Sequence, residues 1–294
     1  MITIKNLDCF EYLKTIESKS IDCVIIDPPY GVLKGHKIET NINIELLISE
    51  VYRVLKDNSF FAFFGQMPTI VNWHLEALKL FNWQQDIVWV KRCATSIYLP
   101  ITRQKELIYI YKKGNIKLNI TKEKYEDIKM PLYLDGLLNI ESLKCYISDL
   151  SSRFKNGNNR IDNIKIINKN NNNKNDKIYE KYSNIRTSRS PELTNITDVW
   201  SFMPENRLSF GKNGNNIKHP TVKPIKLLER LIKLLTKEND IILDCFLGSG
   251  TTAIASLNTN RIFKGCELDL DYYNICLDRV QSVKNLNKID FQNN

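Results

Sequence analysis

The segment Asp27-Pro28-Pro29-Tyr30 carries residue types suited to hold an amino group. It follows a branched apolar run without polar alternation, which predicts a buried strand. Prolines fix φ and lack a backbone donor, so this tip presents a carboxylate, carbonyl oxygens and an aromatic face. Hydrogen bonds from an aromatic amine to Asp27 and to the Pro28 carbonyl would favour a pyramidal nitrogen with an available lone pair. The alternative is a turn that merely ends a strand.

A second candidate site is the glycine-containing turn that follows the apolar run 240–246. Gly248 and Gly250 allow tight backbone geometry and close approach of a ligand. Asp244 precedes the turn, and Glu267 ends the next apolar run, nineteen positions after Gly248. An acid about 20 residues after such a turn suits hydrogen bonding to ribose hydroxyls. The spacing therefore favours a nucleoside site over a plain tight turn.

The residues around the glycines narrow the choice of ligand. Gly250 is followed by Thr251 and not by the Lys of a phosphate-binding P-loop, so a P-loop is excluded. Ala253 stands where a dinucleotide-binding fingerprint has its third Gly, which weighs only slightly against a dinucleotide. Asp244 suits a cationic ligand that carries an amino acid better than a pyrophosphate. S-adenosylmethionine (AdoMet) has an ammonium, a sulfonium and a ribose, so we expect AdoMet.

Composition excludes several other classes of function. The chain has 294 residues, a net charge of +9 and a pI near 9.0, which favours a polyanionic partner. The N-terminus lacks the layout of a signal peptide, and no apolar run approaches the about 20 residues that span a bilayer. Seven cysteines without a Cys-x-x-Cys pair and three distant histidines predict no metal site. We expect reduced, mostly buried thiols in the cytoplasm.

Alternating strands and helices are expected to position these segments. Buried strands are predicted at 21–27, 59–65, 84–92, 105–113, 240–246 and 261–268. Apolar residues at helical spacing predict helices at 43–56, 67–81, 224–236, 248–257 and 269–283. This alternation is typical of a mostly parallel, doubly wound α/β sheet, with 84–92 and 105–113 as an antiparallel pair at one edge.

The alternation fails in the middle of the chain. Within 151–190 there are ten Lys and Arg against three Asp and Glu, and about 156–177 is a low-complexity, disordered loop by composition. We therefore predict three parts. They are a first half-domain at 1–113, a basic insert at 114–197 and a second half-domain at 198–294.

With these segments in this order, the sequence resembles the β class of amino DNA methyltransferases, which methylate the exocyclic nitrogen of adenine or cytosine. Three motifs carry the resemblance: Asp-Pro-Pro-Tyr at 27–30, His-Pro-Thr-Val-Lys-Pro at 219–224, and Asp-Cys-Phe-Leu-Gly-Ser-Gly-Thr-Thr at 244–252. It covers about residues 1–113 and 198–283. The resemblance implies a circularly permuted Rossmann-like, AdoMet-dependent methyltransferase fold with an inserted target-recognition region.

The resemblance also implies roles for individual residues. Catalysis is expected from Asp27, Pro28, Pro29 and Tyr30, with Tyr30 stacked on the target base. The segment 6–13 resembles the one whose acid borders the AdoMet adenine, and the second motif lines the methionine end. The expected cofactor-binding residues are Asp8, Cys9, Thr221, Lys223, Asp244, Phe246, Gly248, Ser249, Gly250, Thr251, Thr252, Glu267 and Leu268.

Double-stranded DNA is the implied substrate, and a base inside a duplex must be flipped out before it is modified. Lys and Arg hold the phosphates while a few side chains read base edges. The expected DNA contacts are Lys91, Arg92, Arg103, Arg153, Arg160, Arg186 and Arg189. Arg103 and Glu106 fit the family's Arg-x-x-His-Glu, although Lys105 replaces its His. A solvated basic loop is the alternative for the insert.

Several alternatives stay open. Asp27 favours adenine N6, because the family tends to carry Ser in its place for cytosine N4. RNA and protein-glutamine methyltransferases typically place the glycine loop before the tip, so the order here argues against both. A DNA-binding module without catalysis is a second class, against which the intact Asp27, Tyr30 and Glu267 argue. A second copy of the chain and a cognate restriction endonuclease are further partner hypotheses.

Overall fold

The computed structural model describes residues 1–29, 42–91, 104–124, 193–202, 209–210, 217–218 and 222–290. The chain divides into two compact units, formed by residues 1–120 with 198–294 and by residues 121–197. In the second unit, the described strands form one antiparallel pair, β6 (Lys122–Lys124) with β7 (Leu193–Asn195). The first unit contains both segments that are expected to do chemistry.

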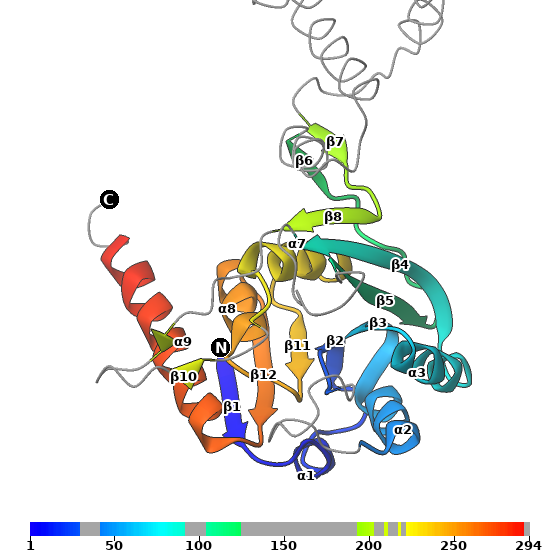
Figure 1. Cartoon of the computed structure of the whole chain (residues 1–294), viewed down its shortest axis with the longest axis horizontal. Helices are drawn as coiled ribbons and strands as arrows, with labels where there is room; N and C mark the ends of the chain where they lie inside the picture. The colour runs from blue at the N-terminus through cyan, green and yellow to red at the C-terminus, as the bar shows by residue number, and fades with distance from the viewer. Residues whose placement is uncertain are drawn as a thin grey trace, which may run out of the picture. The chain divides into compact units, whose positions relative to one another are not determined.

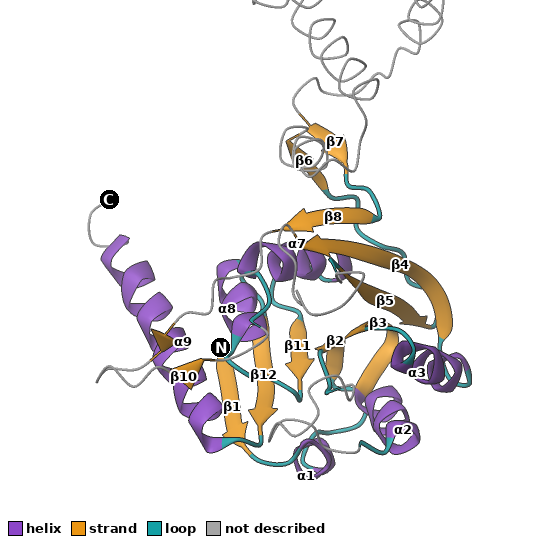
Figure 2. Cartoon of the chain, viewed as in Figure 1, coloured by secondary structure: helices purple, strands orange, loops and turns teal. Residues whose placement is uncertain are grey.

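An eight-stranded sheet forms the centre of the first unit, in the order β1-β12-β11-β2-β3-β5-β4-β8 (Figures 1 and 2). Neighbouring strands are parallel except at β5, which runs antiparallel to both β3 and β4. The strands are β1 (Ile2–Asn6), β2 (Ile21–Ile26), β3 (Leu55–Gly65), β4 (Asn82–Lys91), β5 (Lys105–Lys113), β8 (Val199–Phe202), β11 (Ile241–Asp244) and β12 (Ile262–Glu267). The short strands β9 (Ser209–Phe210) and β10 (Ile217–Lys218) form a separate antiparallel pair.

Helices cover the central strands on both faces, which is why those strands are continuous apolar runs. Val24 and Phe61 share a core cluster with residues of the first three helices, whereas the buried Cys23 and Phe60 point to the opposite face by alternation. None of the helices among the described residues has the length and apolarity needed to cross a bilayer. The helices are α1 (Cys9–Lys14), α2 (Ile44–Val54), α3 (Thr69–Leu78), α7 (Ile225–Leu235), α8 (Thr251–Asn258) and α9 (Leu270–Asp290).

The direction of winding reverses between the neighbouring strands β11 and β2. From β11 the chain passes through α8 to β12 on one side, and from β2 it passes through α2 to β3 on the other. Because such crossovers are right-handed, α8 and α2 cover opposite faces of the sheet. Leu243 lies beside Val24 in the parallel register, so Asp244 and Asp27 come at the same edge. The crevice at such a reversal is where α/β sheets bind ligands.

The predicted fold class is confirmed, with differences in detail. Helix α2 ends at Val54 and not at 56, because Leu55 already pairs with Ile21 as the start of β3. The predicted antiparallel pair, β4 with β5, forms but is not at the edge, because β8 lies outside β4 with Trp200 beside Trp89. Neither β1 nor β8 was assigned to the sheet from the sequence, since both are short and pair with strands far along the chain.

Candidate functional site

The turn between β11 and α8 holds its glycines in conformations that other residues adopt only under strain. Gly248 has a φ of 53° and Gly250 a φ of 86°. At Gly250, where α8 begins, an added Cβ would collide with the Sγ of Cys276 and lie 3.1 Å from its Cβ. The backbone N–H of Gly248 donates to Oε2 of Glu267 at 2.6 Å. The loop is thereby joined to the carboxylate that ends β12.

Two carboxylates lie beside this loop, of which Asp244 is buried and Glu267 is partly buried. Asp244 is 3% exposed and accepts a hydrogen bond from the backbone N–H of Phe246 at 3.0 Å. Burial raises the pKa of Asp244 to about 7, although hydrogen bonds from Thr252 and Phe246 oppose the shift. Burial also raises the pKa of Glu267, whose Oε1 accepts from the backbone N–H of Asp269 at 2.9 Å. A bound cation would be stabilised here, because an opposite charge favours the ionised form of each carboxyl.

Asp8 and Cys9 lie at the start of α1. The Oδ1 of Asp8 caps this helix by accepting from the backbone N–H groups of Phe10 at 2.8 Å and Glu11 at 3.4 Å. Burial raises the pKa of the Cys9 thiol to about 12, so Cys9 packs as a thiol and not as a nucleophile. The cysteines among the described residues are free and buried, as the sequence predicted: Cys9, Cys23, Cys245, Cys266 and Cys276.

The carboxylate of Asp27, just after β2, lies in a cluster of buried charges. The Lys223 ammonium bonds Asp27 Oδ2 and lies 3.3 Å from Glu106 Oε2 on β5. The other Glu106 oxygen bonds the Lys91 ammonium of β4 and accepts from Gln66 at 3.3 Å. Asp27 Oδ1 is buried and has no hydrogen-bond partner among the residues that the structure describes. Burial raises the pKa of Asp27, and Lys223 opposes the shift.

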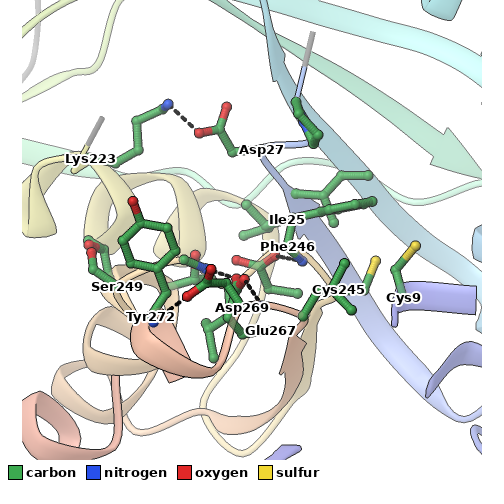
Figure 3. A pocket seen from close by; sticks show the side chains of 18 of the residues that line it. Cys9, Ile25, Asp27, Lys223, Cys245, Phe246, Ser249, Glu267, Asp269 and Tyr272 are labelled. Atoms are coloured by element: carbon green, nitrogen blue, oxygen red, sulfur yellow. Dashed lines mark hydrogen bonds and ion pairs between the residues drawn. The ribbon is translucent and has the colours of Figure 1, made fainter. Parts of the chain in front are cut away.

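A cavity of 560 Å³ joins the Asp27 tip to the glycine loop (Figure 3). Asp27 and Lys223 lie at one end of the view, and Glu267, Asp269 and Tyr272 gather at the other. Pro28 and Gly250 are described but do not line this cavity, and Gly250 acts on the shape of the loop. The predicted site residues that line it are Asp8, Cys9, Asp27, Pro29, Lys223, Asp244, Phe246, Gly248, Ser249, Thr251, Thr252, Glu267 and Leu268.

Other predicted residues have different outcomes. Lys91, expected to contact DNA, is only 8% exposed because its ammonium pairs with Glu106, so its charge is committed inside the protein. Lys223, expected beside the methionine end of the cofactor, lines the cavity but bonds Asp27. The predicted residues that lie outside the described part of the chain are Tyr30, Arg92, Arg103, Arg153, Arg160, Arg186, Arg189 and Thr221.

Some lining residues were not predicted. Asp269 and Tyr272 enter the cavity at the start of α9, and Asp269 Oδ1 accepts from the backbone N–H of Tyr272 at 3.1 Å. Their signal was the acidic and aromatic run directly after Glu267. Phe64 also lines the cavity, and it had no signal because the run 60–64 of β3 is apolar throughout. Glu106 does not line the cavity but contacts Lys223 behind it, and it could have been predicted because it fits the motif segment that contains Arg103.

Comparisons with known proteins identify the family of this chain. A sequence model of the DNA methylase family matches residues 21–278. The Type II methyltransferase M1.MboII of Moraxella bovis is 27% identical over 282 residues, which cover 92% of this chain and 93% of that protein. The Type II methyltransferase M.HpaI of Haemophilus parainfluenzae is 26% identical over 278 residues, covering 92% of this chain and 71% of that protein.

Solved structures show the same fold. The M1.HpyAVI–SAM complex superposes with a TM-score of 0.55 at 20% identity, covering 95% of this chain and 100% of that one. The cytosine-N4-specific PvuII DNA methyltransferase superposes with a TM-score of 0.55 at 14% identity, covering 97% of this chain and 93% of that one. Because the family match extends over most of the chain, from β2 into α9, this protein belongs to the DNA methylase family of N6 and N4 amino methyltransferases.

Proposed function

We propose that this chain transfers a methyl group from AdoMet to the exocyclic N6 of adenine in a specific sequence of double-stranded DNA. One observation carries the proposal. Asp27, whose buried Oδ1 has no hydrogen-bond partner in the described part of the chain, lines the same cavity as the acidic glycine-loop site. A buried oxygen without a hydrogen bond is costly unless a ligand supplies a donor. An exocyclic amino group is such a donor.

The cavity has the chemistry that AdoMet requires. Its 560 Å³ lies within the range of about 300–1,000 Å³ that small-molecule sites occupy. Asp244 and Glu267 provide carboxyl groups whose ionised forms a cationic ligand with a ribose would favour, and Phe246 and Tyr272 provide aromatic surface. AdoMet, abbreviated SAM, is also the molecule bound in the similar M1.HpyAVI–SAM complex.

In the proposed mechanism, the protein prepares the amino group and aligns it. When bound, AdoMet supplies the electrophilic methyl group. Asp27 and the Pro28 carbonyl accept hydrogen bonds from the amino group, which favours a pyramidal nitrogen whose lone pair is available. This lone pair would form the new N–C bond as the bond between the methyl group and sulfur breaks, the neutral thioether would leave, and the nitrogen would lose one proton through Asp27 to solvent. Tyr30 stacks on the flipped base in this proposal. The closed loop of Gly248 keeps the cofactor in line, so that alignment supplies much of the rate enhancement.

The choice of adenine over cytosine rests on the residue at position 27. An aspartate is the residue that the family tends to carry for adenine N6, and this chain has Asp27. The fold does not decide the matter, because the PvuII enzyme with a similar fold is cytosine-N4-specific. Mass spectrometry of nucleosides from DNA of cells expressing the chain, followed by single-molecule sequencing, reports the base and its context. N4-methylcytosine without N6-methyladenine would overturn the adenine proposal.

Asp27→Ala tests the mechanism directly. We expect the single-turnover methylation rate to fall by about 10²–10³, as when one preorganised hydrogen-bonding group is removed. AdoMet binding, measured by calorimetry, should remain detectable because the glycine loop is untouched. The matched control is Asp57→Ala, since Asp57 is exposed and its ion pair with Lys19 lies outside the cavity. Near wild-type methylation by Asp27→Ala would show that the mechanism is wrong. Wild-type protein that binds AdoMet and DNA without transfer would favour an inactive DNA-binding module.

The basic insert is proposed to read and hold the DNA. Its surplus of Lys and Arg within 151–190 includes Arg153, Arg160, Arg186 and Arg189, which would contact phosphates or base edges. The half-domains 1–113 and 198–294 would then carry the reaction, with the insert 114–197 between them. We further propose that the chain forms a homodimer, has a cognate restriction endonuclease as a partner and acts in the cytoplasm. Mass photometry of the purified chain checks the first of these.

A further inference from the structure

Three charges are gathered behind the Asp27 carboxylate, and the four groups come from four separate segments. Asp27 follows β2, Lys91 ends β4, Glu106 lies on β5, and Lys223 precedes α7. The contacts form one chain from Lys91 through Glu106 and Lys223 to Asp27. Lys91, Glu106 and Lys223 are 8%, 3% and 7% exposed. The two positive and two negative charges balance.

Stability alone does not account for this chain of contacts. Replacing a buried ion pair with apolar residues of similar volume is often neutral or stabilising. The chain also ends unevenly, because Lys223 takes up Asp27 Oδ2 while Asp27 Oδ1 has no partner among the described residues. Glu106 Oε2 also lacks a hydrogen bond, but it faces the Lys223 ammonium at 3.3 Å, whereas Asp27 Oδ1 faces no such partner among the described residues. This difference leaves one carboxylate oxygen of Asp27 as the acceptor for a substrate amino group.

We propose that Lys223 is a positioning residue for Asp27, and that Glu106 anchors Lys223 in this role. This inference rests on the proposed function and deepens it. The Lys223 ammonium fixes the Asp27 carboxylate through Oδ2 and keeps it ionised, so that Oδ1 accepts from the amino group. Glu106 holds Lys223 in place and limits how strongly its positive charge acts on Asp27. Lys91 neutralises Glu106 from the other side.

The two partners act on Asp27 with opposite signs. The charged and titratable groups that face Asp27 are Lys223, Glu106, Lys91 and, across the cavity, Asp244. Burial and the Glu106 charge raise the pKa of Asp27, whereas Lys223 and Lys91 lower it. Removing Lys223 should therefore raise the pKa of Asp27 further, and removing the Glu106 charge should lower it.

This opposition gives a test that general damage to the fold cannot imitate. The ionised Asp27 is the active form, so single-turnover methylation is lost as the pH falls through the pKa of Asp27. Lys223→Met should move this acid limb to higher pH by about one to three units, the effect of one adjacent opposite charge on a carboxyl. Its rate should recover in alkaline buffer. Glu106→Gln should move the limb to lower pH, by less, because the Glu106 charge acts on Asp27 more weakly than the Lys223 charge does.

Matched variants separate charge from packing. Lys223→Arg keeps the charge and should keep the acid limb near its wild-type position. Lys56→Met removes a lysine whose ion pair with Asp22 does not involve the cavity, and it should leave the limb unchanged. If Glu106→Gln does not fold, the double variant Lys91→Met/Glu106→Gln removes a neutral pair and should move the limb in the same direction. Thermal unfolding of each variant checks that it is folded.

A measurement that does not depend on turnover tests the charge network around Asp27 separately from the proposed adenine methylation. Infrared difference spectroscopy follows the Asp27 carboxyl during a pH titration, with Asp27→Asn identifying its band. Opposite shifts in Lys223→Met and Glu106→Gln would support the network, even if wild-type protein methylated no adenine and the proposed function failed. Equal shifts, or no shift in either variant, would overturn the network while leaving adenine methylation intact. A loss of rate at every pH without a shifted limb would show that Lys223 is only structural.

Discussion

Gly250→Ala should destabilise the protein through two separable effects. An alanine forced into the left-handed φ of 86° loses about 1–2 kcal/mol, because its Cβ approaches the following carbonyl oxygen. The same Cβ collides with the Sγ of the fully buried Cys276 and lies 3.3 Å from its Cα, which adds about 1–3 kcal/mol of overpacking. We therefore expect the free energy of unfolding to fall by about 2–5 kcal/mol. AdoMet affinity should fall as well, because the loop that includes Gly248 must shift.

Urea unfolding measures the loss, and two further variants divide it. Gly114 has a φ of 77°, and a Cβ added there would lie 2.7 Å from Oδ1 and 3.0 Å from the backbone N of Asn58. Asn58 is exposed and can give way more easily than the buried Cys276, so Gly114→Ala should show the backbone strain of about 1–2 kcal/mol and a smaller packing cost. Cys276→Ala removes the colliding sulfur, so the double variant with Gly250→Ala should recover about 1–3 kcal/mol relative to additivity. The reasoning would be refuted if Gly250→Ala lost no more free energy of unfolding than Gly114→Ala. It would also be refuted if the loss in the double variant equalled the sum of the losses in the two single variants.

The pKa of Asp244 is about 7 in the folded protein, against an ordinary 3.8. As the pH rises, the Asp244 carboxyl therefore loses its proton at a lower pH in the unfolded chain than in the folded one. The free energy of unfolding should thus fall by up to about 4 kcal/mol as the pH rises from about 4 to about 7. Urea unfolding across that pH range checks this decrease. If the free energy of unfolding of Asp244→Asn fell just as steeply with pH, the prediction would be wrong. Arg53 donates to the carbonyls of Leu13 at 2.8 Å and Ile16 at 2.9 Å, so Arg53→Ala should lower the free energy of unfolding by about 2–3 kcal/mol without changing AdoMet affinity. Urea unfolding measures the change in stability of Arg53→Ala, and calorimetry measures its AdoMet affinity. A weakened AdoMet affinity would contradict the second expectation. The logarithm of DNA affinity should fall linearly with the logarithm of salt concentration, with a slope of about −0.9 for each phosphate contact. A flat salt titration would argue against the role of the basic insert.

The fold class could be predicted because the central strands are buried on both faces. A run such as 59–65 has no polar alternation, and helical periods separate it from its neighbours, which together indicate a doubly wound sheet. The edges were harder to predict. The strand β1 has intermediate and exposed residues, and β8 is only four residues long, so neither carries a strong local signal. Their hydrogen bonds come from β12 and β4, which lie far along the chain.

The sequence by itself determined the chemical types of the site and their order along the chain. Asp27 after a buried strand, and Gly248 with Glu267 around a strand-to-helix turn, are local patterns that survive without knowledge of the fold. Only the tertiary structure decided that Lys223 bonds Asp27, 196 positions earlier, and that Glu106 from β5 holds the same ammonium. The physical reason is that buried charges must find partners where the fold brings segments together. Spacing along the chain does not record which lysine meets which carboxylate.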